Sequence, residues 1–450
     1  MLKSRPSFPQ STEHCHEISR SAQVPNTHFP VDRRDPLVPQ NPLLTELGKA
    51  YVVGIDQTLV DIEAHVDEDF LTRYGLSKGH SVVINDDVAE RIYDELKANN
   101  MVVSEFAGGT IGNTVHNYSV LADSHSILLG VMSQDIRIGC YAYRYLCNTS
   151  SRVNLDYLQP VDGPIGRCFT FITECGERSF GINAGKMNQL DVQHIPEDVI
   201  KGASALVITA YLVRGDDGDP MKEAAMTAVR YAREAGIPVV LTLGTRFVID
   251  ENPQWWRDFI AENVTVLAMN EDEGEALTGI ADPLGAADKA LDWADMVLCT
   301  AGPIGLYMAS YTDEDYKRET THTLLPGVIP EFNMYEFSRP MARAKCRKPA
   351  RIYSHISPYM GGPEKIKNTN GAGDGALSAV LHDMVANSYH RMNVPNSAKH
   401  ISEFLTYSSL AQVCKYANRV SYEVLAQSSP RLSRGLPEKE DSLEEVYWER

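Results

Sequence analysis

Short apolar runs alternate with helical patterns along most of this chain of 450 residues. Apolar runs of about four to eight residues, bounded by turn residues, are typical of buried strands. The segments between them carry apolar residues on one helical face, as Val88, Ile92 and Leu96 do. Regular alternation of this kind predicts an α/β fold, a mostly parallel sheet with helices on both faces, and such sheets bind ligands at the carboxyl ends of their strands. The expected strands span 50–56, 81–86, 101–109, 126–133, 204–212, 238–243, 264–270 and 295–302.

Two stretches break the alternation. Residues 58–66 and 166–183 have the character of hairpin strands, and we expect them to form a small sheet that covers the site as a lid, built from about 57–85 and 150–185. Residues 313–365 are irregular and rich in Pro, Arg and Lys, which indicates an insertion. One domain is expected over 49–430, preceded by an extended proline-rich arm over 1–48 and followed by a C-terminal tail over 431–450.

Charge and cysteine usage argue against several classes of protein. The chain has 42 Lys and Arg against 60 Asp and Glu, a formal net charge of −18, which argues against broad binding to nucleic acid. No run approaches the roughly 18 apolar residues of a membrane span, and the N-terminus has no apolar signal segment. The eight cysteines form no CxxC pair, which indicates reduced thiols. We therefore expect a cytoplasmic protein that binds neither nucleic acid nor membranes; homo-oligomerisation stays open.

The strongest functional signal is the segment NTNGAGDG, residues 368–375, which runs into the helical pattern ALSAVLHDMVA. A glycine-rich turn that opens a helix points unpaired backbone N–H groups and the positive end of the helix dipole at one spot. Such a spot suits the negative charge that develops when a phosphoryl group moves. Gly371 and Gly373 allow close backbone approach, and Asp374 in the same turn is close enough to accept a proton from an attacking hydroxyl.

This segment has two other interpretations. It also satisfies the loose dinucleotide pattern GxGxx(G/A), which would indicate an NAD-linked oxidoreductase. That pattern should follow the first strand of a βαβ unit and precede an acidic residue by about 20 positions, and neither condition holds here. A glycine-rich helix cap without function is the second alternative. The chain contains no Walker A sequence, which excludes a P-loop.

Polar segments follow three other expected strands. Residues 270–273, Asn-Glu-Asp-Glu, can hold Mg²⁺ directly or through water, although an ordinary acidic helix start explains them as often. The segments 108–114 and 56–61 follow two more strands. The vicinal hydroxyls of a sugar need a carboxylate that accepts two hydrogen bonds, which Asp56 or Asp61 can supply, and Asn113 can both donate and accept. Taken singly, each of these residues is more often a turn or cap residue.

Read together, these segments resemble the PfkB (ribokinase-like) family of carbohydrate kinases. NTNGAGD matches the family signature DTxGAGD except that Asn368 replaces the leading Asp. MNEDEGEALTG resembles the NxxE element, AGGTIGNT resembles the glycine pair on the substrate side, and LVDIEAHVDEDFLTRYGL is similar to the opening segment of adenosine kinases. Extended over nearly the whole chain, through YRYLCNTSSR, YMGGPEKI and KYANRVSYEVL, the likeness is greatest to bacterial members that phosphorylate inosine and guanosine.

The resemblance implies a Rossmann-like core with a small β lid, and phosphoryl transfer from Mg·ATP to the 5′-hydroxyl of inosine or guanosine, giving IMP or GMP in purine salvage. Asp374 would be the general base, beside an anion hole formed by the amides of Gly371, Ala372 and Gly373. Asn270 and Glu273 would organise Mg²⁺ through water. The other implied ATP-binding residues are Asn370, Thr300, Gly302 and Gly305, and the implied nucleoside-binding residues are Asp56, Gln57, Asp61, Gly108, Gly109, Thr110, Gly112, Asn113 and Arg214.

Several points stay open at this level. Arg214 is placed to meet a substrate or product phosphate, and a structural salt bridge explains it equally well. Members of the family often respond to K⁺, and Asn368 stands where the leading Asp contributes to that site, so dependence on K⁺ is undecided. An adenosine or sugar kinase of the same family and a nucleotide-binding regulator without catalysis are the alternative functions.

Overall fold

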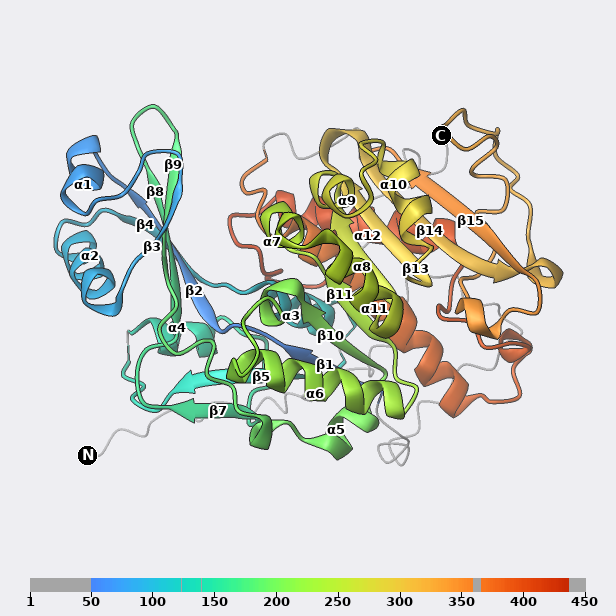
Figure 1. The fold of residues 1–450 in the computed structure, drawn as a ribbon, viewed down its shortest axis with the longest axis horizontal. Helices are drawn as coiled ribbons and strands as arrows, with labels where there is room; N and C mark the ends of the chain where they lie inside the picture. Colours follow the sequence, from blue (N-terminus) through green and yellow to red (C-terminus); the bar gives the residue numbers. More distant parts are fainter. Residues whose placement is uncertain (1–49, 123, 139, 359–365, 437–450) are drawn as a thin grey trace, which may run out of the picture.

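The computed structural model describes residues 50–122, 124–138, 140–358 and 366–436. The expected arm over 1–48 and residues 437–450 of the expected tail lie outside this range, as do residues 359–365. The described chain forms a large α/β body and a smaller sheet that extends to the left of it in Figure 1. None of the helices in the described ranges has the length and apolar character needed to cross a bilayer.

The large body is built on one mostly parallel sheet, as the alternation predicts. Its parallel strands are, in order across the sheet, β6 (Val153–Asn154), β5 (Ser126–Ser133), β1 (Val52–Ile55), β10 (Ala205–Thr209), β11 (Val239–Thr242), β12 (Val266–Asn270) and β13 (Met296–Ala301). The short strand β7 (Leu158–Val161) also pairs with β5. Strands β14 (Gly305–Asp313) and β15 (Pro349–Ile356) complete the far edge in antiparallel pairing.

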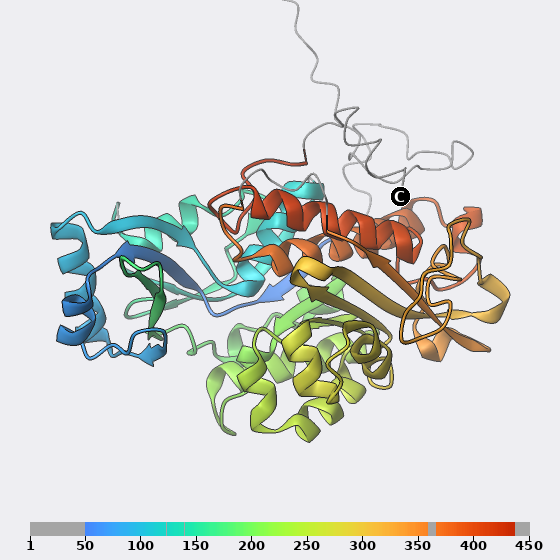
Figure 2. The same ribbon diagram turned by 90° about the horizontal axis from the view of Figure 1, so that it is seen from above.

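Helices cover both faces of this sheet (Figure 2). One face carries α3 (Thr110–Ala122), α11 (Ala372–Asn393) and α12 (Leu410–Leu425), and the other carries α5 (Glu197–Lys201), α6 (Pro220–Glu234), α7 (Arg246–Glu251), α8 (Pro253–Asn263), α9 (Glu271–Thr278) and α10 (Pro283–Ala290). Alternate residues of one strand serve the two cores: Val207 of β10 packs on the first side, and Leu206 and Ile208 pack on the second. Burial on both faces explains why these strands are continuously apolar in sequence.

The smaller sheet has five strands in the order β3 (Ser81–Val83), β9 (Arg178–Asn183), β8 (Gly166–Ile172), β2 (Leu59–His65) and β4 (Val102–Ala107). Helices α1 (Glu68–Arg73) and α2 (Asp86–Ala98) pack on one face through a core that includes Val60, Ile62 and Phe171. Helix α4 (Tyr141–Cys147) lies where this sheet meets the large body. The two segments expected as hairpin strands therefore do lie side by side in a separate small sheet.

Three details of the expected organisation are wrong. Residues 101–109 were expected among the strands of the main sheet, but they contribute β4 to the small sheet, because an apolar run alone does not specify its pairing partner. Within the expected lid segment 150–185, β6 and β7 pair with β5 in the main sheet. Within the expected insertion 313–365, residues 349–356 form the edge strand β15, which pairs with β14 along its whole length.

Candidate active site

The segment 368–375 opens helix α11 as expected, and the helix begins in an open, uncapped turn. Gly371 is the N-cap residue with φ of 80°, a left-handed conformation that glycine adopts without strain, and no side chain caps the helix. A Cβ on Gly371 would lie 2.5 Å from Pro430, whereas a Cβ on Gly373 would meet no atom within 4 Å. The backbone at Gly373 therefore borders free space at the positive end of a long helix, which is the environment that an anionic phosphate needs.

Asp374 lies in this first turn and touches the substrate-side glycine segment. Its Oδ2 accepts a hydrogen bond of 3.0 Å from Nδ2 of Asn113, in the first turns of α3. Burial raises the pKa of Asp374 to about 7; the hydrogen bond from Asn113 and the charge of Arg431 oppose the rise, and the charge of Asp61 adds to it. A carboxyl with a pKa near neutrality is suited to accept a proton during turnover.

Asp56 follows β1 and is enclosed by the glycines of 108–112. Its Oδ2 accepts a hydrogen bond of 2.6 Å from the amide of Gly112, at the start of α3. Gly109 has φ of 87°, and a Cβ there would lie 2.1 Å from Oδ2 of Asp56. Asp56 is 1% exposed, and burial raises its pKa to about 7 although the amide of Gly112 and the charge of Arg431 lower it. In the described structure, this carboxylate anchors the turn before α3.

Asp61 lies on β2 of the small sheet and faces the same glycines. A Cβ on Gly108 would come within 2.4 Å of Oδ2 of Asp61, so this glycine lets the small sheet approach α3. Burial raises the pKa of Asp61 to about 6, Arg431 lowers it and Glu63 raises it. Asp61 is partly exposed, whereas Asp56 is not, which makes Asp61 the better placed of the two for a sugar. The nearby Gln57 donates a hydrogen bond to Asn188.

Arg431 is a member of this cluster that the sequence did not indicate. Its guanidinium donates from Nε to Oδ1 of Asn113 at 3.0 Å, from Nη2 to the carbonyl of Gly108 at 3.0 Å and from Nη1 to Oγ1 of Thr149 at 2.7 Å. The residue is 4% exposed. It is the first residue of the expected tail, and a single arginine beyond the last helical pattern carries no signal that would place it in a site.

The segment 270–273 begins helix α9 with a capping box. Oδ1 of Asn270 accepts from the amide of Glu273 at 2.8 Å, and Oε2 of Glu273 accepts from the amide of Asn270 at 2.9 Å. Burial raises the pKa of Glu273 to about 7, and the charges of Asp272, Glu271 and Asp374 add to the rise. A cation near this group would relieve the repulsion between these carboxylates.

The donors of this segment fit Mg²⁺ that is held through water and phosphate. The side chains of Asn270 and Glu273 both carry oxygen atoms that can bind a cation. The hydrogen bonds that these two side chains make join the two residues to each other. In the described ranges no group of three His, Cys, Asp or Glu side chains is arranged as a metal cage. Such a cage is not needed, because Mg²⁺ keeps several waters and commonly binds through one or two carboxylates together with the phosphates of a substrate.

The other residues expected on the ATP side lie beside this segment or before α11. Thr300 pairs with Asn270 in the parallel register of β13 and β12. Gly302 and Gly305 have φ of 45° and 114°, and a Cβ on Gly305 would lie 2.1 Å from the carbonyl oxygen of Ile356. The amide of Asn370 donates to Oδ1 of Asn368, whose Nδ2 donates to the carbonyl of Ser428, so Asn368 shapes the turn before α11.

Two expected nucleoside residues lie in different settings. Thr110 is the first residue of α3, next to the glycine pair. Arg214 is exposed and lies over the rings of Tyr211 and Phe247, with its Cζ 5.2 and 5.8 Å from their centroids. Stacking on two aromatic rings holds the guanidinium in place, while its N–H groups stay available for an anion.

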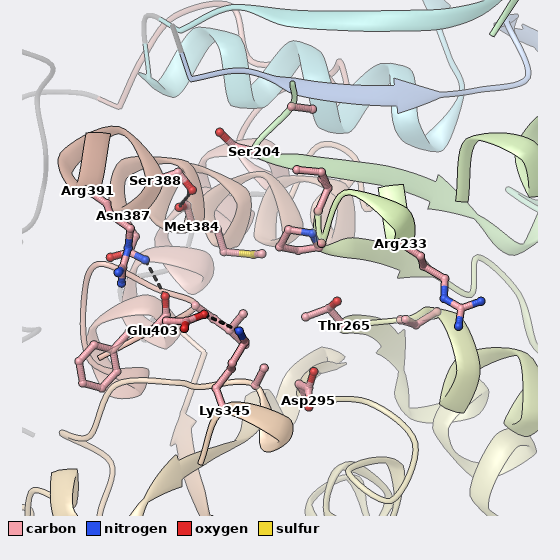
Figure 3. A pocket seen from close by; sticks show the side chains of 18 of the residues that line it. Ser204, Arg233, Thr265, Asp295, Lys345, Met384, Asn387, Ser388, Arg391 and Glu403 are labelled. Carbon is pink, nitrogen blue, oxygen red and sulfur yellow. Dashed lines mark hydrogen bonds and ion pairs between the residues drawn. The ribbon is translucent and has the colours of Figure 1, made fainter. Parts of the chain in front are cut away.

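A cavity of about 840 Å³ lies at the amino ends of the strands of the main sheet, at the other end of these strands from the candidate site (Figure 3). Ser204, Thr265 and Asp295, which line it, immediately precede β10, β12 and β13, so it opens at the amino ends of the strands. None of the expected site residues, all of which are described, lines this cavity. The chemistry-bearing side chains gather instead at the carboxyl ends, as the fold class predicts.

Comparisons with known proteins agree with this arrangement. A model of the pfkB family carbohydrate kinases matches residues 80–324. The guanosine-inosine kinase of Escherichia coli strain K12 is 69% identical over 423 residues, which cover 94% of this chain and 98% of that protein. Adenosine kinase 2 of Arabidopsis thaliana is 29% identical over 147 residues, 32% of this chain and 41% of that protein.

Solved structures show the same fold. The adenosine kinase from Sinorhizobium meliloti matches with a TM-score of 0.59 at 22% identity, covering 86% of this chain and 96% of that one. A probable sugar kinase from Rhizobium etli CFN 42 matches with a TM-score of 0.61 at 19% identity and the same coverage. The expected ribokinase-like α/β fold with a small β-sheet is therefore confirmed.

Proposed function

Because this chain belongs to the pfkB family of carbohydrate kinases, we propose that it transfers a phosphoryl group from ATP to the 5′-hydroxyl of guanosine and of inosine, giving GMP and IMP. The observation that carries the reaction type is the uncapped first turn of α11, where Asp374 lies beside the open space at Gly373. The choice of nucleoside is supported by the 69% identity, over nearly the full length of both chains, to a guanosine-inosine kinase. We place this salvage step in the cytoplasm, where ATP is available.

Asp374 is proposed as the general base. It would accept the proton of the 5′-hydroxyl as the oxygen attacks the terminal phosphorus of ATP and the bond from that phosphorus to the bridging oxygen of ADP breaks. The amides of Gly371, Ala372 and Gly373, at the positive end of α11, would stabilise the charge on the phosphoryl oxygens. Oδ2 of Asp374 already accepts from Asn113, which leaves its other oxygen for the hydroxyl.

Asn270 and Glu273 are proposed to hold hydrated Mg²⁺ beside the phosphates. The ion supplies positive charge that neutralises the phosphate oxygens when it is bound. Thr300, Gly302, Gly305 and Asn370 would line the rest of the ATP side.

The nucleoside is proposed to lie between the small sheet and α3. Asp61 would accept hydrogen bonds from the vicinal ribose hydroxyls, and the backbone of Gly108 and Gly109 would border the sugar. Gln57, Thr110, Gly112 and Asn113 would complete this side, with Asp56 holding the turn beneath it. Arg214, held over Tyr211, would meet a phosphate of substrate or product.

Initial rates with Mg·ATP and guanosine, inosine, adenosine or ribose test this proposal. Guanosine and inosine should be phosphorylated with kcat/KM well above that of adenosine and ribose. A preference for adenosine or ribose would leave the kinase chemistry intact and overturn the choice of substrate. Binding of ATP without phosphorylation of any of the four would indicate a regulator instead.

A further inference from the structure

The segment that follows the last described helix places Arg431 in the candidate site, and α3 binds its backbone before and after Arg431. Asn117 of α3 donates from Nδ2 to the carbonyl of Pro430 at 3.1 Å and accepts at Oδ1 from the amide of Leu432 at 2.7 Å. His116 of the same helix lies 2.9 Å from the carbonyl of Leu432. The backbone on both sides of Arg431 is therefore tied to α3, and its side chain points into the cluster around Asn113.

The chemistry of arginine determines which way the amide of Asn113 faces. A guanidinium has only N–H donors, so the atom that meets Nε of Arg431 at 3.0 Å must be the carbonyl oxygen of Asn113. The NH₂ group of Asn113 then faces Asp374 and donates to its Oδ2 at 3.0 Å. A reversed amide would place N–H against the guanidinium and oxygen against the carboxylate, and both contacts would be repulsive. Arg431 thus selects the one amide orientation that supports Asp374.

We propose that Arg431 is a positioning residue for phosphoryl transfer, which orients the amide of Asn113 so that this amide holds the Asp374 carboxylate with one oxygen free for the nucleoside hydroxyl. The proposal rests on the proposed function, because it assigns Arg431 to the reaction in which Asp374 is the base. The other bonds of the guanidinium, to the carbonyl of Gly108 and the hydroxyl of Thr149, fix its plane, so Arg431 is itself well ordered for this task.

Arg431 also supplies the positive charge within a group of carboxyls. It lowers the pKa of Asp56, Asp61 and Asp374, in each case against a larger rise caused by burial. Among the described residues, the titratable groups that face this cluster are Asp56 after β1, Asp61 and Glu63 on β2, His116 on α3, Tyr145 on α4, Cys168 on β8, Glu273 on α9 and Asp374 on α11. Loss of the arginine should therefore make Asp374 harder to ionise as well as less well oriented.

A purely structural role makes a different prediction. If Arg431 only fastened the C-terminal segment to α3, then loosening that segment elsewhere should have the same effect on catalysis. Asn117→Ala is the matched control, because it removes both hydrogen bonds to the neighbouring backbone and leaves the contacts of the guanidinium in place. The control should lower the unfolding temperature without moving the pH dependence of activity.

The test uses the full chain, with guanosine and Mg·ATP, between pH 5.5 and pH 9. Arg431→Met should lower kcat by about 10- to 100-fold, the usual effect of a small misplacement of a catalytic group, and should move the acid limb of the kcat profile to higher pH. Arg431→Lys should restore the pH midpoint better than it restores kcat, since lysine returns the charge but not the planar fork. Added guanidinium ion should raise the activity of Arg431→Ala and not that of Asn117→Ala.

Asn113→Leu keeps the inference testable if the Arg431 variants do not fold, because Arg431 retains its bonds to Gly108 and Thr149 in that variant. By itself it should lower kcat by about 10- to 100-fold and move the acid limb of the kcat profile to higher pH. Where Arg431→Met does fold, the double variant should lose little more than either single variant. Additive losses, or an unchanged pH midpoint in Arg431→Met and Asn113→Leu, would overturn the role of Arg431. Absence of guanosine phosphorylation by the wild-type protein would instead overturn the proposed function, so the two failures are distinguishable.

Discussion

Replacing Asp374 by asparagine should stabilise this protein while it removes turnover. The pKa of the carboxyl rises from 3.8 to about 7, chiefly because burial removes water from the ionised group. A rise of about three pH units corresponds to about 4 kcal/mol of unfavourable free energy when the folded protein carries this charge. The side chain is partly exposed, and contact with solvent reduces the penalty to about 2 kcal/mol. Asparagine can still accept the hydrogen bond from Asn113, but it cannot ionise.

The gain in stability has a defined dependence on pH. Because the pKa of Asp374 is higher in the folded state than in the unfolded state, this carboxyl costs the wild-type protein stability as the pH rises from about 4 to about 7, and the variant lacks that contribution. The gain should be full at pH 8, about half as large at pH 5.5 and small near pH 4. For the 378 described residues the entropy of unfolding is about 0.8 kcal/mol/K, so about 2 kcal/mol raises Tm by about 2–3 °C at pH 8.

Thermal unfolding of wild type and Asp374→Asn at pH 5.5 and pH 8 measures this difference. Asp135→Asn is the control, because 85% of the Asp135 side chain is exposed and its charge has no burial penalty to lose. Turnover of guanosine by the same preparations should fall by a factor of about 10²–10⁴ in Asp374→Asn. Equal stability of Asp374→Asn and wild type at pH 8 would refute the burial argument, and unchanged turnover would refute the assignment of the base.

The same geometry predicts three further results. In pH–rate profiles, kcat/KM for guanosine should fall about tenfold per pH unit below about pH 7, because protonated Asp374 accepts no proton; a flat profile would contradict this. Gly373→Ala should keep the wild-type Tm yet lower turnover, because its Cβ enters space left for phosphate. Gly109→Ala should lower the free energy of unfolding by about 1–3 kcal/mol or more, because its Cβ would collide with Asp56 and the residue has positive φ. Thermal unfolding of Gly373→Ala and Gly109→Ala measures both effects on stability, and equal Tm values for the two variants would refute the predicted difference. Asp61→Asn should raise KM for guanosine and leave KM for ATP unchanged, as initial rates with each substrate varied in turn will show; a rise in KM for ATP alone would remove Asp61 from the sugar side.

The glycine-rich turns show why the local part of the site is readable from sequence. Gly371 is needed at positive φ before α11, and the same turn carries Asp374, so one short segment encodes both the helix start and the proposed base. The capping box of Asn270 and Glu273 is equally local, spanning four residues where β12 ends and α9 begins. In each case the pattern predicts the geometry because the interacting groups are neighbours in the chain.

The pairing partners of the strands were harder to predict from the sequence. Residues 101–109 have the apolar run of a buried strand, yet β4 pairs with β2 in the small sheet, since a run of this kind specifies burial and not the partner. The edge strand β15 was hidden in a segment rich in polar residues, because an edge strand with one neighbour needs less apolar character.

The sequence by itself determined the α/β class, the location of the site at the carboxyl ends of the strands, and the glycine-rich turn that carries Asp374 at the start of a helix, because each follows from the spacing of nearby residues. Only the tertiary structure decided the connection from Arg431 through Asn113 to Asp374. These contacts join residues 318 and 261 positions apart, and neither arginine nor asparagine signals its partner in the local pattern. Hydrogen bonds between distant segments arise when packing of β1, α3 and α11 brings the side chains together, so no local rule anticipates them.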